Sequence, residues 1–419
     1  MMSNVFIGGG GEVSLVLHKA TNQYRVIKQI EKFGGQNSSK VNRLNKKLAY
    51  EGKLLAALDH PNIVKVHEIL QDENQVAMVL EYVEGKDLSH YYKNDPLFDS
   101  LPAIATIIEQ ILSALAYLHN KGIIHKDIKL QNIVLEEPTA FSNLKLIDFG
   151  FSEIKNRDWT KNNAGTAYYL APEILQKDYD KKCDLWSVGI LLYLFLFKEF
   201  PFRGKTFGEI SDQILNKNID DLINEKEKKN PLAIQFLKKL LERDPENRYS
   251  AKEALNDPFI QTYTRFPKMY AKDFELFKVY HDKTVMELVF SSVYVHNLMT
   301  SKEKSNFVRV FRCLDKQRRG YICNEDFLAL DFNNDKDIMK VEVNEPNTGK
   351  LGLTNLIISC VNLNKNDEIR QLFVYLDRDQ DLMVKMEDLY DVLEKYIDKK
   401  VLEQIKTQFK KLKDQQVKN

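Results

Sequence analysis

The sequence predicts an α+β domain followed by an all-α domain, and three observations support this fold class. Short β-branched runs separated by glycines and turns recur through residues 1–83. Apolar residues at helical spacing mark Ile104–His119 and dominate residues 184–263. Helical spacing returns from residue 274 onwards. With 419 residues, the chain is long enough for two or three domains.

Composition narrows the class of protein. Hydrophobic residues make up 43% and charged residues 29%, which is typical of a soluble globular protein, and the net charge of +1 argues against a nucleic-acid partner. The apolar run Val188–Phe197 is too short to cross a bilayer, and no signal peptide or myristoylation glycine is present. We therefore expect a cytoplasmic protein without a membrane anchor.

Reduced thiols are expected at the four scattered cysteines, Cys183, Cys313, Cys323 and Cys360.

The N-terminal strands surround a glycine run. Val5–Ile7 and Leu15–Leu17 read as strands, and the segment between them contains Gly8, Gly9, Gly10 and Gly11. Glycines let backbone amides approach a phosphate closely, although a plain hairpin turn would use the same residues. A third strand, Tyr24–Lys28, ends on a lysine.

A helix is expected from residue 41 to residue 58. Glu51 lies in it beside an apolar stripe, so its carboxylate can meet a buried lysine or remain a solvated surface charge. A turn at residues 59–62 then enters a strand at Ile63, and a further strand, Val76–Val83, is ended by Gly85.

The segment His125–Asn132 lies between an amphipathic helix, Ile104–His119, and a strand that begins at Ile133. Asp127 can accept a hydroxyl proton, Lys129 can steady a moving phosphoryl group, and Asn132 can hold a metal ion. Such a string alone is usually an ordinary polar loop. The motifs elsewhere in the chain decide between the two interpretations.

Eight features occur in order along the chain: the glycine-rich loop, Val26–Lys28, Glu51, His125–Asn132, Asp148–Gly150, Ala171–Glu173, Asp184–Gly189 and Arg248. Together these features resemble the motifs of eukaryotic protein kinases over residues 1–265. The resemblance implies a two-lobe protein kinase fold, with an N-lobe of residues 1–83, a C-lobe of residues 84–263 and ATP in the cleft between them.

The resemblance also implies roles for individual residues. Asp127, Lys129 and Asn132 would be catalytic, with Asp127 as the base, and Asp148 would bind Mg²⁺ together with Asn132. Lys129, together with Thr166, indicates protein substrates with Ser or Thr acceptors. Glu173 and Arg248 would pair within the C-lobe. The expected nucleotide-binding residues are Gly8, Gly9, Gly10, Gly11, Val13, Val26, Lys28, Glu51, Glu81 and Val83, with Tyr82 in the same hinge and Leu80 behind it.

Three positions depart from the kinase pattern. Phe6 takes the first glycine position when Gly11 is aligned on the last, so the loop is compressed or one glycine short. Lys126 replaces the usual arginine and lacks its bidentate fork for a phosphate on Ser152 or Thr160. Gln131 replaces a glutamate that is common in kinases with basic substrates. A nucleotide-binding scaffold without turnover therefore remains the alternative function.

The C-terminal third contains a repeat, because Phe311–Asp315 recurs as Phe373–Asp377 before a charged loop and an apolar helix. The repeat resembles the EF-hand, and the whole chain resembles the calcium-dependent protein kinases. This implies an intramolecular regulatory domain at 301–400, followed by a helical tail at 401–419. The segment 264–300 is either a last helix of the kinase lobe or an autoinhibitory junction.

Calcium binding is expected to be weak or lost. An EF-hand loop needs oxygen ligands at positions 1, 3, 5 and 12 and glycine at position 6. The loop 315–326 has Gln317 and Arg319 at positions 3 and 5, and the loop 344–355 lacks carboxylates at positions 3, 5 and 12. The loop 377–388 has Leu382 in place of the glycine. The only calcium candidates are thus the four carboxylates at the ligand positions of this last loop, Asp377, Asp379, Asp381 and Asp388.

Overall fold

The computed structural model covers the whole chain and describes most of it. The described residues are 3–8, 11–29, 38–71, 76–92, 99–139, 141–150, 167–224, 230–264, 267, 269–270, 273, 277, 283–328, 349–363, 366–377, 384–394, 402–403 and 406–407.

The N-lobe is an antiparallel sheet with one helix packed on it. The strand order is β1-β2-β3-β5-β4, and α1 contacts β4 and β5. Leu48 and Leu55 of the helix and Met78 of the sheet are buried in the shared core. The elements are β1 (Ser3–Gly8), β2 (Gly11–His18), β3 (Gln23–Gln29), α1 (Ser38–Ala56), β4 (Val66–Gln71) and β5 (Val76–Glu81).

The C-lobe is built around two apolar helices, α3 and α6. Ser100 caps α3 by accepting a hydrogen bond from the Ala103 N–H. Helix α3 is long and apolar enough to cross a membrane, but 89% of that apolar window is buried inside the protein, where the helix forms part of the core. The elements are α2 (Leu88–Tyr91), α3 (Leu101–Asn120), η2 (Leu130–Asn132), β6 (Ile133–Leu135), β7 (Leu144–Leu146), α5 (Pro172–Gln176), α6 (Cys183–Phe197), α7 (Phe207–Asn216), α8 (Ile219–Asn224), α9 (Pro231–Leu240), α10 (Ala251–Leu255) and α11 (Pro258–Tyr263).

The C-terminal domain is all-helical and has its own apolar core. Ile322 and Leu351 exchange backbone hydrogen bonds of 2.9 and 2.8 Å, which pairs the two loops 315–326 and 344–355. Its helices are α13 (Val285–Asn297), α14 (Ser301–Leu314), α15 (Asn324–Leu328), α16 (Leu353–Cys360), α17 (Asn366–Leu376) and α18 (Met386–Leu393).

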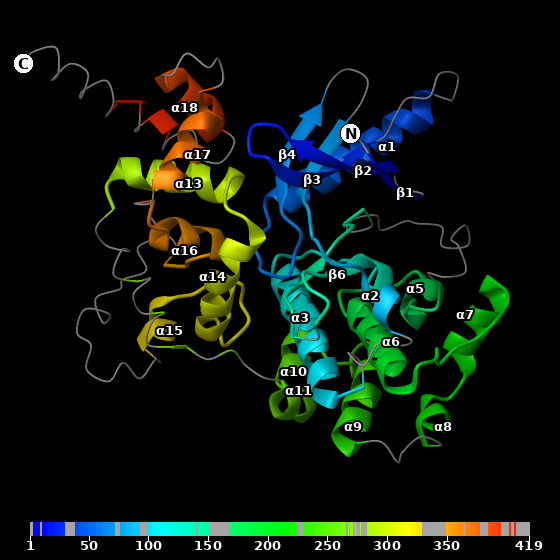
Figure 1. Ribbon diagram of the computed structural model, residues 1–419. Helices are drawn as coiled ribbons and strands as arrows, with labels where there is room; N and C mark the ends of the chain where they lie inside the picture. The colour runs from blue at the N-terminus through cyan, green and yellow to red at the C-terminus, as the bar shows by residue number, and fades with distance from the viewer. Residues whose placement is uncertain are drawn as a thin grey trace, which may run out of the picture.

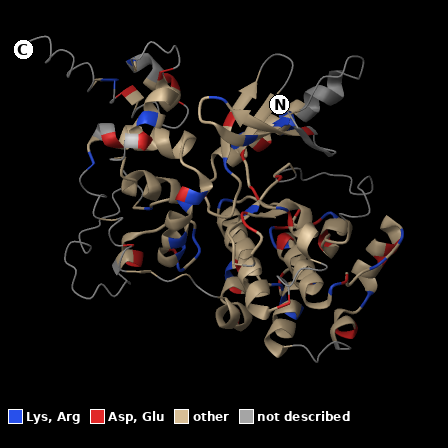
Figure 2. Cartoon of the chain, viewed as in Figure 1, with Lys and Arg blue, Asp and Glu red and all other residues tan. Residues whose placement is uncertain are grey.

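The three parts lie side by side in Figure 1, with the blue N-lobe above the cyan-to-green C-lobe and the yellow-to-red C-terminal domain beside both. Acidic and basic residues are interspersed over all three parts (Figure 2), in keeping with the net charge of +1. The predicted two-lobe α+β fold with an all-α C-terminal domain is confirmed.

Several elements refine the sequence expectations. The strand expected at Ile63 begins at Val66, and Ile63 itself forms a single bridge to Leu146. Both copies of the repeat end a helix, since Leu314 closes α14 and Leu376 closes α17. Helix α13 packs against α16, α17 and α18, so its described contacts place it in the C-terminal domain core, apart from the nucleotide site.

A buried ion pair anchors the C-lobe. Arg248 and Glu173 are both almost fully buried, and the guanidinium binds both carboxylate oxygens, with Nη2 3.0 Å from Oε2. Arg248 also donates from Nε to the Glu242 carbonyl at 2.7 Å and lies over the Trp186 ring. The buried guanidinium and carboxylate therefore both have hydrogen-bond partners inside the core.

We expect Glu173→Gln to lower the free energy of unfolding by roughly 3–5 kcal/mol, because it leaves the Arg248 charge buried without its counter-ion. Urea unfolding followed by tryptophan fluorescence measures the change. Glu199→Gln is the matched control, since it breaks the exposed Glu199–Arg203 pair and should cost less than about 1 kcal/mol. Equal losses in the two variants would contradict the assignment.

Candidate active site

The loop after α3 brings together the three predicted catalytic side chains. Asp127 is buried, and its Oδ2 accepts hydrogen bonds from Lys129 Nζ at 2.7 Å and Asn132 Nδ2 at 2.9 Å. Asn132 Nδ2 also donates to the Asp127 carbonyl at 2.8 Å. The turn η2 carries Asn132 back towards Asp127, so a carboxylate, an ammonium and an amide converge within one short loop.

Asp184, at the start of α6, holds this loop in place. Its carboxylate accepts the backbone N–H groups of His125 at 2.9 Å and Lys126 at 2.7 Å, and it bonds His119 Nε2 at 2.9 Å. Lys126 has a left-handed backbone with φ of 66°. Because a non-glycine residue in that region is strained, the two N–H bonds to Asp184 supply the support that the loop needs.

Lys28 on β3 links the two lobes. Its ammonium lies 2.8 Å from Glu51 Oε1 on α1 and 2.9 Å from Asp148 Oδ1 after β7. Burial alone would lower the pKa of Lys28, but Asp148 and Glu51 outweigh it and hold the pKa above its ordinary value. Burial would raise the pKa of Asp148, but Lys28 lowers it to about 2, so Lys28 and Asp148 are charged at neutral pH.

Phe149 fixes the direction of Asp148. The Phe149 ring is buried and meets the His125 ring edge-on at 4.7 Å, which ties the segment after β7 to the catalytic loop. Asp148 has φ of 61°, and the turn that follows lets the Gly150 N–H donate to Oδ1 at 3.3 Å. The carboxylate is thereby held beside Lys28.

The residues expected around adenine lie on strands β2, β3 and β5 of the sheet. In the ladder Val13 lies opposite Lys28, and Val26 lies opposite Leu80. The Glu81 carboxylate accepts the Lys65 N–H at 2.6 Å and pairs with Lys145 at 3.0 Å. Because its side chain is engaged there, Glu81 could contact a nucleotide only through its backbone.

Three glycines, Gly8, Gly11 and Gly85, mark the ends of this region. β1 and β2 pair up to Gly8 and Gly11, so only two residues separate the paired strands. This agrees with the compressed loop expected from Phe6, which lies opposite Val13. At Gly85 an added Cβ would lie 1.9 Å from the Leu135 carbonyl oxygen, so the segment after β5 can pass β6 only with glycine.

The chemistry of the donor set fits Mg²⁺, which prefers oxygen ligands and binds through one or two carboxylates plus phosphates. Asn132 uses its amide nitrogen to bond Asp127, which leaves the amide oxygen for a metal. Among the described residues, Lys28 and Gly150 bond Oδ1 of Asp148, which leaves Oδ2. Asn132 and Asp148 would therefore hold the ion.

The structure describes only part of the predicted calcium loop. Asp377 is described, and it is buried at the end of α17. Calcium binding at this loop therefore stays a prediction. Outside the described residues lie Gly9, Gly10, Ser152, Thr160, Thr166, Asp379 and Asp381, and the side chain of Asp388.

Sequence reasoning missed the supporting role of two residues at the site. Asp184 and Phe149 entered only as parts of motifs, whereas the structure shows them holding the catalytic loop and Asp148. A signal for Asp184 was available, because it is the one acidic residue that opens the otherwise apolar run of α6. An isolated carboxylate in such a run indicates buried polar partners.

Two curated proteins are similar to this chain over most of its length. Calcium-dependent protein kinase 6 of Plasmodium berghei (strain Anka) is 30% identical over 396 residues, covering 91% of this chain and 26% of that protein. Calcium-dependent protein kinase 5 of Plasmodium falciparum (isolate 3D7) is 28% identical over 401 residues, covering 92% of this chain and 69% of that protein. The chain thus spans about a quarter of the first relative and over two thirds of the second.

A solved structure and a family model complete the comparison. The crystal structure of Rad53 1-466 in complex with AMP-PNP matches with a TM-score of 0.50 and 29% identity, over 62% of this chain and 64% of that one. The family model of the protein kinase domain matches residues 3–260, which is more than half of the chain. The chain therefore belongs to the protein kinase family, and it is similar to calcium-dependent protein kinases over nine tenths of its length.

Proposed function

We propose that this protein is a cytoplasmic Ser/Thr protein kinase that transfers the γ-phosphoryl group of ATP to protein substrates. The observation that carries the proposal is the link from Lys28 to both Glu51 and Asp148. It brings the phosphate-binding lysine of the N-lobe to the metal-binding carboxylate of the C-lobe. Bound Mg-ATP would supply the phosphoryl group and the charge neutralisation.

The protein's own groups would orient the acceptor and take its proton. Asp127 Oδ2 is the base, and the bonds from Lys129 and Asn132 fix the direction of that carboxylate. Lys129, two residues after Asp127, is the residue that favours Ser/Thr acceptors. Its ammonium would also stabilise the transferred group.

We infer further that calcium contributes little to this kinase. In the loop 315–326, Arg319 at position 5 pairs with Asp326 at position 12. A guanidinium therefore stands where a calcium ion would need two oxygen ligands.

Asp127→Asn should reduce phosphoryl transfer by at least ~100-fold, because the amide cannot accept the hydroxyl proton. Radiolabel transfer from ATP to a generic Ser/Thr substrate measures the loss, and a thermal shift with Mg-ATP checks that nucleotide still binds. Asp220→Asn, which alters an exposed carboxylate paired with Lys238, is the control. A wild-type chain that binds Mg-ATP without transfer would instead favour the scaffold function.

Replacing a chelator with excess Ca²⁺ should change the transfer rate by less than the ~5-fold expected of an allosteric coupling, because the first two loops lack adequate ligands. The same radiolabel assay measures both conditions. A larger stimulation that disappears in Asp377→Ala would contradict the expectation and identify the loop 377–388 as the working site.

A further inference from the structure

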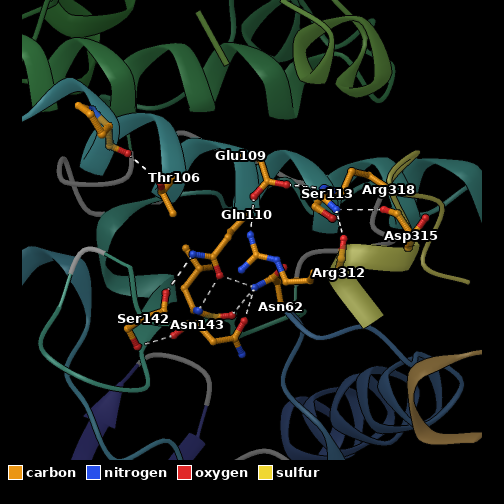
Figure 3. Close-up of polar contacts among 12 residues, drawn as sticks. Asn62, Thr106, Glu109, Gln110, Ser113, Ser142, Asn143, Arg312, Asp315 and Arg318 are labelled. Atoms are coloured by element: carbon orange, nitrogen blue, oxygen red, sulfur yellow. Dashed lines mark hydrogen bonds and ion pairs between the residues drawn. The ribbon is translucent and has the colours of Figure 1, made fainter. Parts of the chain in front are cut away.

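A buried carboxylate on the kinase domain faces two arginines of the C-terminal domain. Glu109 lies midway along α3 with 1% of its surface exposed. Arg312 Nη2 lies 2.7 Å from Glu109 Oε2, and Arg318 Nε bonds the other oxygen, Oε1. Figure 3 shows the three side chains meeting between α3 and the end of α14 with the loop that follows it.

The arginines have further partners within their own domain. Arg318 Nη1 donates to the carbonyls of Arg312 at 2.8 Å and Asp315 at 3.0 Å. Burial alone would raise the pKa of Glu109, but Arg318 and Arg312 hold it below its ordinary value. The buried charges are thus compensated across the interface, which a buried ion pair requires if it is to hold two surfaces together.

The loop that presents Arg318 is closed by its own side chains. Asp315 at position 1 accepts the N–H groups of Arg319 at 2.8 Å and Gly320 at 2.7 Å. Asp326 at position 12 accepts the Cys323 N–H at 2.8 Å and pairs with Arg319. The cation that faces the Asp326 carboxylate is therefore the Arg319 guanidinium, which stays protonated at every physiological pH.

Gly320 lets the closed loop approach the kinase domain. It has φ of 77°, and a Cβ there would lie 2.3 Å from the Tyr117 ring on α3. The Tyr117 hydroxyl accepts the Asp59 N–H at 2.9 Å, and the Asp59 carboxylate accepts the Thr354 N–H at 2.9 Å. Asp59 thus caps α16, whose own N-cap, Gly352, has no side chain to do so.

A third set of contacts joins the C-terminal domain to the N-lobe at the end of α13. Arg25 donates to the Asn297 carbonyl at 3.0 Å, and Gln23 donates to the Leu298 carbonyl. A cation at a helix C-terminus meets the carbonyls that the helix leaves without partners. The domain is therefore held on both lobes, by groups that need no metal ion.

We propose that the C-terminal domain docks on the kinase domain without calcium, through the ion pairs of Glu109 with Arg312 and Arg318. In the loop 315–326 the guanidinium of Arg319 takes the part that a calcium ion would play in shaping the loop. The proposal deepens the calcium independence proposed above. Its test measures docking and not phosphoryl transfer, so its failure and that of the kinase assignment are distinguishable.

The experiment uses the full chain in chelator and compares three variants. Amide hydrogen exchange of the α14 and α3 peptides is measured together with the radius of gyration from small-angle scattering. In the wild type we expect the same radius with chelator and with Ca²⁺. In Arg312→Gln/Arg318→Gln the radius should rise and exchange of the α14 peptide should quicken at least ~10-fold, since the Glu109 carboxylate loses both partners.

Arg309→Gln is the matched control, because Arg309 lies on the same helix but pairs with Asp273 outside the kinase domain. It should change exchange at the α3 interface by less than ~2-fold. Glu109→Gln tests the contact from the other side, and a retained thermal shift with Mg-ATP shows that the kinase domain is folded. A wild-type chain that becomes compact only with Ca²⁺, or a double variant as compact as the wild type, would overturn the proposal.

Discussion

The ammonium of Lys28 is the point on which the arrangement of the active site depends. It bonds one carboxylate from α1 and one from the segment after β7. Side chains from three elements of the two lobes therefore meet at one ammonium group. Lys28 and Glu51 are largely buried, and each would be costly to bury alone. The position of α1 against the sheet and the direction of Asp148 are therefore coupled, and both must be correct before nucleotide can bind productively.

The same principle recurs at the buried carboxylates of the apolar helices α3 and α6. Asp184 in α6 holds the catalytic loop, and Glu109 in α3 receives the C-terminal domain. Gln110, next to Glu109, binds Asn62 at 2.8 Å and the Ser142 carbonyl at 3.0 Å, so it joins α3 to the segment before β7. Neighbouring polar residues on one buried helix thus serve two different interfaces.

Two loops of the C-terminal domain, 315–326 and 344–355, meet through residues that the structure describes. Gly320 and Gly349 both have positive φ, and Ile322 pairs with Leu351. In the first loop, Arg319 at position 5 pairs with Asp326 at position 12. A loop shape that usually depends on an ion is here supported by side chains of the same chain.

The motifs of the kinase core could be read from the sequence because each one is local. A glycine run between strands, an Asp-x-Lys-x-x-Asn loop and an Asp after a buried strand have fixed spacing, and their geometry follows from the backbone conformation that the spacing imposes. The weakness of the calcium loops was also readable, since a ligand set is counted within twelve positions.

Only the tertiary structure decided which distant groups meet. Nothing local to Glu109 indicates that its partners lie some two hundred positions later, or that Asp59 would cap a helix of another domain. Likewise, the sequence left open whether the segment before residue 300 belongs to the kinase lobe, whereas packing assigns α13 to the C-terminal core. Such contacts depend on how folded surfaces fit together, and this fit is not encoded in any short stretch of residues.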